Sequence, residues 1–489
     1  MKSILRATVI LSSSSIASIL VGLAAAKAWA VLLGPSGLGF MGLLQALVAL
    51  AGLIAGMSVG AGLVREGANA IEHEDHIQVA ALRNAGWLLF WVFGGLGVFV
   101  LVVLRIPVSR WMLGDESHAG SVVLMSIALL FNLASGIQTS LLNMHHRVNA
   151  LARFGIINSV LGSIVAIIFV WIWHEQGIVL AVIAGSITGW LISSYMLKRE
   201  VEYAPAHPSS AQVYAAAIIL LRFGGPYTAS LMVGSGVQFL LPALVLNTLG
   251  AEGVGFYRAA SSVAGVYLGF LIAAMGQDYF PRVSAVSDKP VALVELVNQQ
   301  HRLVMLLTVP LILVVLALAP YLVPIIYSPE FAPTVEVLEW HLIGDLFKFA
   351  SWTMGFIILV RSSSVVLFFV ELAAGVNLIG SSWLFMQWYG VAGLGMGFLF
   401  TYIVHYLIVW IIVRRDIHLI WTLENRLMFI SAALVMLVIR LLPGMGLDQW
   451  RTPVALALAF IVGLGSLNIL TTEIGGIKNV RAWLRGNPT

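Results

Sequence analysis

An aspartate and a lysine interrupt a long apolar stretch of the sequence, at LIGDLFKFA in residues 342–350. Asp345 and Lys348 are three positions apart, so a helix would place both side chains on one face. A charge at the centre of a membrane-spanning helix costs at least about 2.5–3.5 kcal/mol, and such side chains therefore face protein or water. Two interpretations are open: a pair that neutralises itself, or part of a hydrated site that binds a charged group.

Three further charges lie within or at the ends of expected spans. Lys27 lies two turns from the outer end of the first span, Arg258 begins the eighth, and Glu371 lies in the eleventh. We expect the cations Lys27, Arg258 and Lys348, which come from both halves of the chain, to meet around a cavity that attracts an anion. Glu371 is a candidate proton carrier, because a desolvated carboxylate takes up a proton more readily. An interhelical hydrogen bond is the alternative interpretation of Glu371.

The elements that carry these residues must be membrane-spanning helices. Hydrophobic residues make up 60% of the 489 residues and charged residues 10%, whereas a soluble domain has about 45–50% and about 25%. Apolar runs long enough to cross a hydrocarbon layer of about 30 Å recur along the whole sequence. Because backbone groups in lipid must be satisfied within the segment, we predict an all-α polytopic membrane protein with about fourteen transmembrane helices.

The distribution of Lys and Arg predicts the orientation of these spans. With both termini in the cytoplasm, most of the cationic residues fall on the inner side, as the positive-inside rule requires. The net charge of +4 therefore reports topology and does not indicate a nucleic-acid partner. The segment that ends in AKAWA at residues 26–30 imitates a secretory signal, but its apolar region is longer than a signal core, and we interpret it as the first span.

Two short patterns occur twice in the sequence. LGPSGLGF begins at Leu33 and its second copy, LGAEGVGF, at Leu249; NSVLGS begins at Asn158 and its second copy, NLIGSS, at Asn377. The separation between the two copies is nearly the same for both patterns, which indicates a duplicated unit of six spans. We interpret the glycines of the first pair as tight turns between helices.

The repeat predicts two parallel six-helix lobes around a central cavity, an arrangement suited to alternating access. The predicted divisions are an N-lobe at 1–200, a C-lobe at 211–415, and an additional helix pair with a cytoplasmic tail at 416–489.

Motifs of catalysis and cofactor binding are missing from the sequence. It contains no G-x-x-x-x-G-K-[ST] phosphate loop, no D-x-D and no H-E-x-x-H, which argues against ATP hydrolysis, glycosyl transfer and metalloprotease chemistry. The HEDH run at 73–76 reads as a polar loop, and the sequence has no cysteine. We therefore expect no cofactor, no metal site and no enzymatic activity.

Three segments carry a resemblance to a known family: AKAWAVLLGPSGLGF, EGVGFYRAASSVAGVYLGF and WHLIGDLFKFASWTMGFIILVRSSSVVLFFVEL. They resemble the Wzx-type flippases of undecaprenyl-diphosphate-linked saccharides, of the O-antigen and enterobacterial common antigen type, in the MOP exporter superfamily that includes the MATE transporters. The likeness covers residues 1–413. The family has residues that match Lys27, Asp345, Lys348 and Glu371 but none that matches Arg258, and residues 414–489 add two spans, as in the lipid II branch.

The resemblance implies a flippase of the bacterial inner membrane that moves a lipid-linked oligosaccharide to the periplasmic leaflet for surface polysaccharide assembly. Lys27 and Lys348, assisted by Arg258, would hold the diphosphate or an acidic sugar. Asp345 would orient Lys348, and Glu371 or Asp345 would couple an ion gradient. The implied partners are the lipid-linked substrate, membrane lipid and polysaccharide polymerase machinery.

Two other functions remain open. A MATE-like, ion-coupled exporter of small molecules has the same lobes, but we would expect fewer cationic and more acidic residues in its cavity. A membrane polysaccharide polymerase or ligase is expected to have a large outer loop with catalytic Arg or His, and the expected outer loops here are short.

Overall fold

The structure, a computed structural model, describes the backbone of residues 2–274, 278–362 and 364–473. Within these ranges the regular elements are all helices, and ten helical stretches are long and apolar enough to cross a membrane. The prediction of an all-α polytopic membrane protein is therefore confirmed. Residues 474–489 of the predicted tail lie outside the described part of the chain.

The chain divides into two compact units, which we describe separately. The first is Met1–Arg258 with Ile326–Glu330, and the second is Ala259–Ile325 with Phe331–Thr489. The predicted divisions at 1–200, 211–415 and 416–489 stay predictions.

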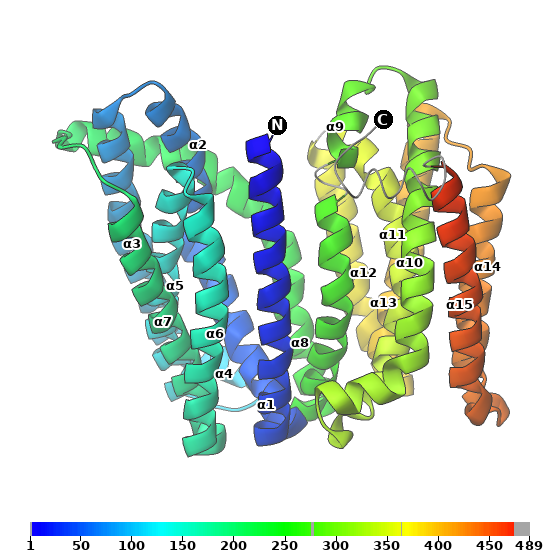
Figure 1. Cartoon of the computed structure of the whole chain (residues 1–489). Helices are drawn as coiled ribbons and strands as arrows, with labels where there is room; N and C mark the ends of the chain where they lie inside the picture. The colour runs from blue at the N-terminus through cyan, green and yellow to red at the C-terminus, as the bar shows by residue number, and fades with distance from the viewer. Residues whose placement is uncertain (1, 275–277, 363, 474–489) are drawn as a thin grey trace. The chain divides into compact units, whose positions relative to one another are not determined.

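The first unit is a helical bundle. It comprises α1 (Lys2–Gly56), α2 (Val59–Glu72), α3 (His76–Val103), α4 (Arg105–Met112), α5 (Ala119–Met144), α6 (Val148–Trp173), α7 (Gly177–Glu200) and most of α8 (Ser210–Ala274). Helix α6 packs against α7 and α1, and α5 packs against α7 and α3; Figure 1 shows these helices lying side by side. The apolar sequence of each helix lets it bury one face against its neighbours and turn another toward lipid.

Two long helices of this unit are broken at the same position of the repeated motif. Gly34 in α1 has φ 64° and ψ −171°, and Gly250 in α8 has φ 76° and ψ −177°. Both are the first glycine of L-G-x-x-G-x-G-F. Glycine adopts this region without a Cβ penalty, so each motif ends one helical segment and begins the next in the same way.

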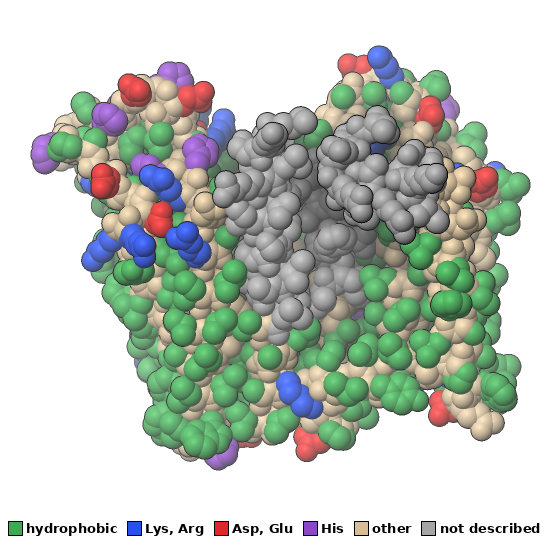
Figure 2. Space-filling model, viewed as in Figure 1, with side chains coloured by type: hydrophobic (Ala, Val, Ile, Leu, Met, Phe, Trp, Pro, Cys, Tyr) green, Lys and Arg blue, Asp and Glu red, His purple; other side chains and the backbone are tan. Residues whose placement is uncertain are grey.

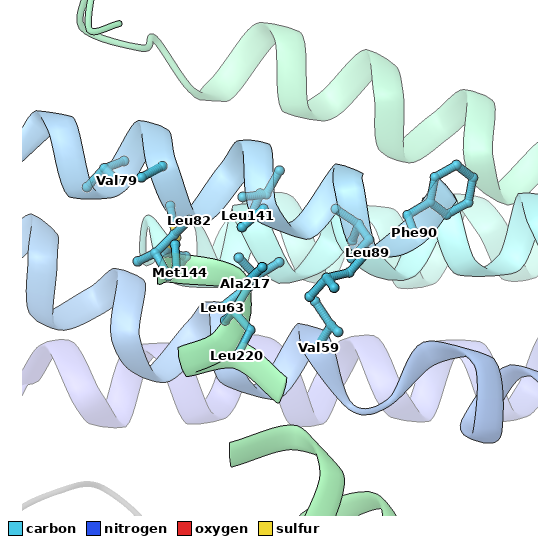
Figure 3. Packing of buried hydrophobic residues seen from close by; sticks show 14 of the residues in the cluster. Val59, Leu63, Val79, Leu82, Leu89, Phe90, Leu141, Met144, Ala217 and Leu220 are labelled. Carbon is cyan, nitrogen blue, oxygen red and sulfur yellow. The ribbon is translucent and has the colours of Figure 1, made fainter. Parts of the chain in front are cut away.

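The start of α8 closes one end of the bundle. Ala217 and Leu220 pack with Leu63 of α2, Leu82 of α3 and Leu141 of α5 in a buried hydrophobic cluster, as Figure 3 shows. Gly62 permits the close approach, because a Cβ there would lie 3.0 Å from the Leu220 side chain. The apolar face of α8 therefore fixes its first turns against three other helices.

The lipid-facing surface of the first unit is apolar. Trp91 and Phe99 on α3 and Trp171 on α6 are well exposed. In the view of Figure 2, hydrophobic side chains cover the flank of this unit, and Lys, Arg, Asp, Glu and His gather at one end of it. Such a band is expected of a surface that contacts hydrocarbon.

The second unit contains α9, which is short, and the longer helices α10 to α15. Their bounds are α9 (Phe280–Ala285), α10 (Pro290–Ile326), α11 (Thr334–Arg361), α12 (Ser364–Tyr389), α13 (Ala392–Ile417), α14 (Leu423–Leu441) and α15 (Asp448–Glu473). The last residue of α10, Ile326, belongs to the first unit. Helix α13 packs against α11 and α12, while α14 contacts α11 and α15. Helix α11 is thus the central helix, buried along most of its length.

Polar contacts attach the α14–α15 pair to this unit at two places. Near the start of α14, Asn425 Nδ2 donates to Asn298 Oδ1 of α10 at 3.0 Å. At the other end, Glu339 of α11 pairs with Arg440 of α14 at 2.9 Å and with Arg451 of α15. Glu339 is only 1% exposed, so this ion-pair network is buried.

Candidate functional site

Two of the predicted site residues share a neighbour, Tyr327, in the first unit. The Lys27 ammonium donates a hydrogen bond to the carbonyl oxygen of Tyr327, and Tyr327 also lies within electrostatic reach of the Arg258 guanidinium. Tyr327 is 1% exposed. The structure therefore brings Lys27 and Arg258 to a common neighbour, although they lie far apart in the sequence.

Arg258 is held by residues that follow the first copy of the repeated motif. Its Nη2 donates a hydrogen bond to Gln45 Oε1, and its side chain passes over Gly42, where an added Cβ would lie 2.9 Å from Arg258 Cδ. Gly42 and Arg258 occupy equivalent positions, because each follows the phenylalanine of its motif, Phe40 or Phe256, by two positions. The small residue in one copy thus makes room for the large cation in the other.

The remaining predicted residues gather around Lys348 in the second unit. Helix α11 supplies Asp345, which is fully buried, and Lys348, which is partly buried. Helix α12 supplies Glu371, an exposed residue within electrostatic reach of Lys348. The structure therefore brings Lys348 and Glu371 near one another, with Asp345 one turn away on the same helix.

Aromatic rings surround the Lys348 ammonium. Its Nζ lies 5.0 Å from the ring centroids of Trp352 and Tyr402 and 5.3 Å from that of Phe398. The faces of such rings attract a cation by about 0.5–2 kcal/mol each. Tyr402 also shares a hydrogen bond with Lys348. These rings stabilise the ammonium while being uncharged themselves.

Two histidines of this cluster were missed by the sequence reasoning. His341 of α11 stacks on Phe398 with ring centroids 3.5 Å apart, and His405 of α13 contacts Ser351 Oγ through Nδ1 at 3.0 Å. Both lie within electrostatic reach of Lys348. The signal was present, because an ionisable residue inside a span indicates function, and His341 lies one turn before Asp345.

The five predicted residues therefore form two groups. Lys27 and Arg258 lie in the first unit, and Asp345, Lys348 and Glu371 lie in the second. Their convergence on one cavity stays a prediction. Among the described residues, no group of three or more His, Asp or Glu could hold a metal ion.

Long apolar helices with ionisable side chains held inside them define a polytopic membrane protein of the transporter class. The family model described as polysaccharide biosynthesis protein matches residues 29–336. The chain belongs to this family.

Curated relatives match over most of the chain. The lipid III flippase of Escherichia coli strain K12 is 21% identical over 428 residues, covering 83% of this chain and 96% of that protein. A putative O-antigen transporter of Shigella flexneri is 23% identical over 328 residues, covering 65% of this chain and 75% of the transporter. Both relatives are named as transport proteins.

Solved structures show the same fold. A lipid II flippase in an inward closed conformation aligns with TM-score 0.69 at 14% identity, over 95% of this chain and 99% of that one. An inward-facing multidrug resistance MATE transporter of the MOP superfamily aligns with TM-score 0.65 at 16% identity, over 82% of this chain and 94% of that one. The predicted MATE-like fold is thus supported independently of the sequence motifs.

Proposed function

We propose that this protein is a flippase, not an enzyme, and that it moves an undecaprenyl-diphosphate-linked oligosaccharide from the cytoplasmic to the periplasmic leaflet of the bacterial inner membrane. The observation that carries the proposal is the match to the lipid III flippase over 96% of that protein. The fold shared with the lipid II flippase supports it.

The proposed topology has fourteen spans, two six-helix lobes and cytoplasmic termini. Three of the ten apolar stretches, Val21–Gly56, Val148–Glu200 and Ser210–Gly265, contain a break in the helix, and about 20 residues suffice for one crossing. Dividing each of them in two, at Gly34, between α6 and α7, and at Gly250, and adding α14, gives fourteen. Alternating access then moves one lobe against the other.

The cationic groups have a direct part in the proposed transport. The diphosphate must cross a medium in which an uncompensated charge is costly. Lys27, Arg258 and Lys348 hold this group or an acidic sugar, while the polyprenyl tail stays in lipid. Asp345 orients Lys348, and Glu371 or Asp345 carries the coupling ion. The expected protein partner is the polysaccharide polymerase machinery, which consumes the flipped substrate.

An ion-coupled small-molecule exporter is the second candidate, favoured by the MATE fold match. The proposed anion site of Lys27, Arg258 and Lys348 argues against it, because cations suit an anionic headgroup better than a cationic drug.

The test is complementation of a strain that lacks its own translocase for a lipid-linked oligosaccharide. The wild-type protein should restore surface glycan and remove the oligosaccharide that accumulates in the inner leaflet. Lys27→Ala and Lys348→Ala should reduce surface glycan at least tenfold at equal membrane abundance. Undiminished surface glycan in both variants would refute the proposed charge site. If the wild-type protein restores surface glycan in none of several strains that make different glycans, the proposed flippase function is refuted.

A further inference from the structure

The first unit contains an open cavity to which the sequence reasoning gave no role. Its volume is about 760 Å³, within the range of about 300–1,000 Å³ that is typical of small-molecule sites. Helices α1, α2, α5, α6 and α7 line it, with one residue of α8, and all of its lining residues belong to the first unit.

The lining combines apolar side chains with uncharged polar ones. The side chains that offer amide or hydroxyl groups are Gln45, Ser58, Asn132, Ser140, Asn158, Ser159, Ser163 and Ser186. Among the lining residues that the structure describes, none is Asp, Glu, Lys, Arg or His. The polar groups of this lining can both donate to and accept from hydroxyls, whereas they cannot neutralise a charge.

Two buried polar atoms of this lining have no hydrogen-bond partner within the part of the chain that the structure describes. They are the indole Nε1 of Trp29 and the amide Oδ1 of Asn158. A buried polar group left without a hydrogen bond costs about 1–3 kcal/mol. A hydroxyl-rich ligand in the cavity would supply both partners once these side chains turn toward it. Trp29 and Tyr227 also bring aromatic rings to the lining.

The repeated motif has different surroundings in its two copies. In NSVLGS of α6, Asn158, Ser159, Gly162 and Ser163 all line the cavity. In NLIGSS of α12, the two serines are buried against α13: Ser381 bonds the carbonyl oxygen of Gly397 at 3.0 Å, and Ser382 is fully buried. The polar side chains of the first copy therefore face the cavity, whereas those of the second copy pack against a neighbouring helix.

The cavity adjoins the charged pair of the same unit. Gln45 lines the cavity and also accepts the hydrogen bond from Arg258. A diphosphate held by Lys27 and Arg258 would thus have its attached sugar next to the uncharged lining.

We infer that this cavity is a subsite for the uncharged sugars nearest the diphosphate of the lipid-linked substrate. The inference rests on the proposed function and adds the chemical class of the saccharide. Hydroxyl and acetamido groups match the amide and hydroxyl lining, and a uronic acid in the same place would have its carboxylate desolvated without a cation.

Two glycines allow the cavity to be filled without disturbing the helices. A Cβ added to Gly136 of α5 or Gly185 of α7 would meet nothing within 4 Å, and both residues line the cavity. Gly95 of α3 is the matched control, because it also has open space but is exposed and does not line the cavity. Leucine is a better helix former than glycine, so none of the three substitutions should impair folding.

The experiment measures binding of two probes to the full-length protein in nanodiscs. The probes are undecaprenyl diphosphate and the same lipid carrying N-acetylglucosamine. Gly136→Leu and Gly185→Leu should weaken binding of the sugar-bearing probe at least tenfold relative to wild type and leave binding of the bare diphosphate within twofold. Gly95→Leu should change neither affinity.

The outcomes separate the inference from the function on which it rests. If wild type binds both probes and the two leucine variants lose both equally or neither, the subsite is wrong and the flippase stands. If wild type binds neither probe, the proposed function is wrong as well. A third probe with glucuronic acid in place of N-acetylglucosamine should bind more weakly to wild type; equal affinity would refute the preference for an uncharged sugar.

Discussion

The backbone of Gly255 lies directly against the carbonyl group of Pro35, with no room for a side chain between them. The reciprocal contact exists between Gly39 and the carbonyl group of Ala251. Gly39 and Gly255 are each the last glycine of L-G-x-x-G-x-G-F, and Pro35 and Ala251 are each its third residue. The two copies of the motif therefore pack on one another through equivalent residues, as a local twofold relation requires.

This contact predicts that either glycine is intolerant of alanine. Gly39→Ala or Gly255→Ala would force a methyl group into backbone atoms, and overpacking of this kind costs about 1–3 kcal/mol. The thermal unfolding temperature of the purified protein should fall for both variants. Gly265→Ala on α8, where an added Cβ meets nothing within 4 Å, is the control and should be neutral or slightly stabilising. Equal unfolding temperatures for all three variants would contradict the tight contact.

The buried carboxylate of Glu339 should be a strong determinant of stability. Glu339→Gln removes the carboxylate that pairs with Arg440 and Arg451, and breaking a buried ion pair costs about 3–5 kcal/mol. The control is Glu424→Gln, which breaks the exposed pair with Arg302 and should cost about 0–1 kcal/mol. Thermal unfolding in detergent measures both variants. Equal losses of unfolding temperature in Glu339→Gln and Glu424→Gln would contradict the strong contribution of the buried ion pair.

The aromatic surroundings of Lys348 predict a graded series at Tyr402. Tyr402→Phe keeps the ring over the ammonium and loses the hydroxyl, whereas Tyr402→Leu loses both. Because ring and cation attract by about 0.5–2 kcal/mol, Tyr402→Leu should lower surface glycan in the complementation assay several-fold more than Tyr402→Phe. A phenylalanine variant as inactive as the leucine variant would show that only the hydroxyl matters.

His145, at the C-cap of α5, predicts a loss of stability in acid. Burial, followed by the charges of Arg147 and His146, lowers the pKa of His145 from its ordinary value of 6.5. The unfolded chain therefore takes up this proton before the folded protein does. The neutral form of His145 contributes its full stability to the folded protein above pH 6.5. This contribution is lost as the pH falls through the lowered pKa that His145 has in the folded state.

The measurement is the unfolding temperature of wild type and His145→Gln between pH 8 and pH 5. The neighbouring ionisable groups are His76, Arg83, Glu202 and Tyr203, which line one pocket with His145. The wild type should lose more stability than the variant over this interval. If the unfolding temperatures of wild type and variant fall in parallel with pH, the pH dependence comes from those neighbours and not from His145.

The helices and the repeat were predictable because each depends on a pattern within a short stretch of sequence. Apolar runs predicted the helical spans, and the paired glycine motifs predicted the turns at Gly34 and Gly250. The grouping of Asp345 with Lys348 followed from helical spacing alone. These features require no knowledge of which helices are neighbours.

The cavity of the first unit and the pairing of Arg258 with Gln45 could not be predicted in this way. The cavity is built from residues on six helices, and only Asn158, Ser159, Gly162 and Ser163 belong to a pattern that the sequence repeats. The Arg258 contact joins residues 213 positions apart. Their proximity is a property of packing between helices, which no local pattern encodes.

The ion pairs of Glu339 with α14 and α15 also limit how this chain can change in evolution. A deletion that removed the last two helices in one step would leave an anion on α11 facing hydrocarbon, with both of its cations gone. A shorter descendant would therefore first have to replace the residue at position 339 with an apolar one. Conversely, an ancestor of twelve helices could acquire helices α14 and α15 only together with side chains that hold them against α11.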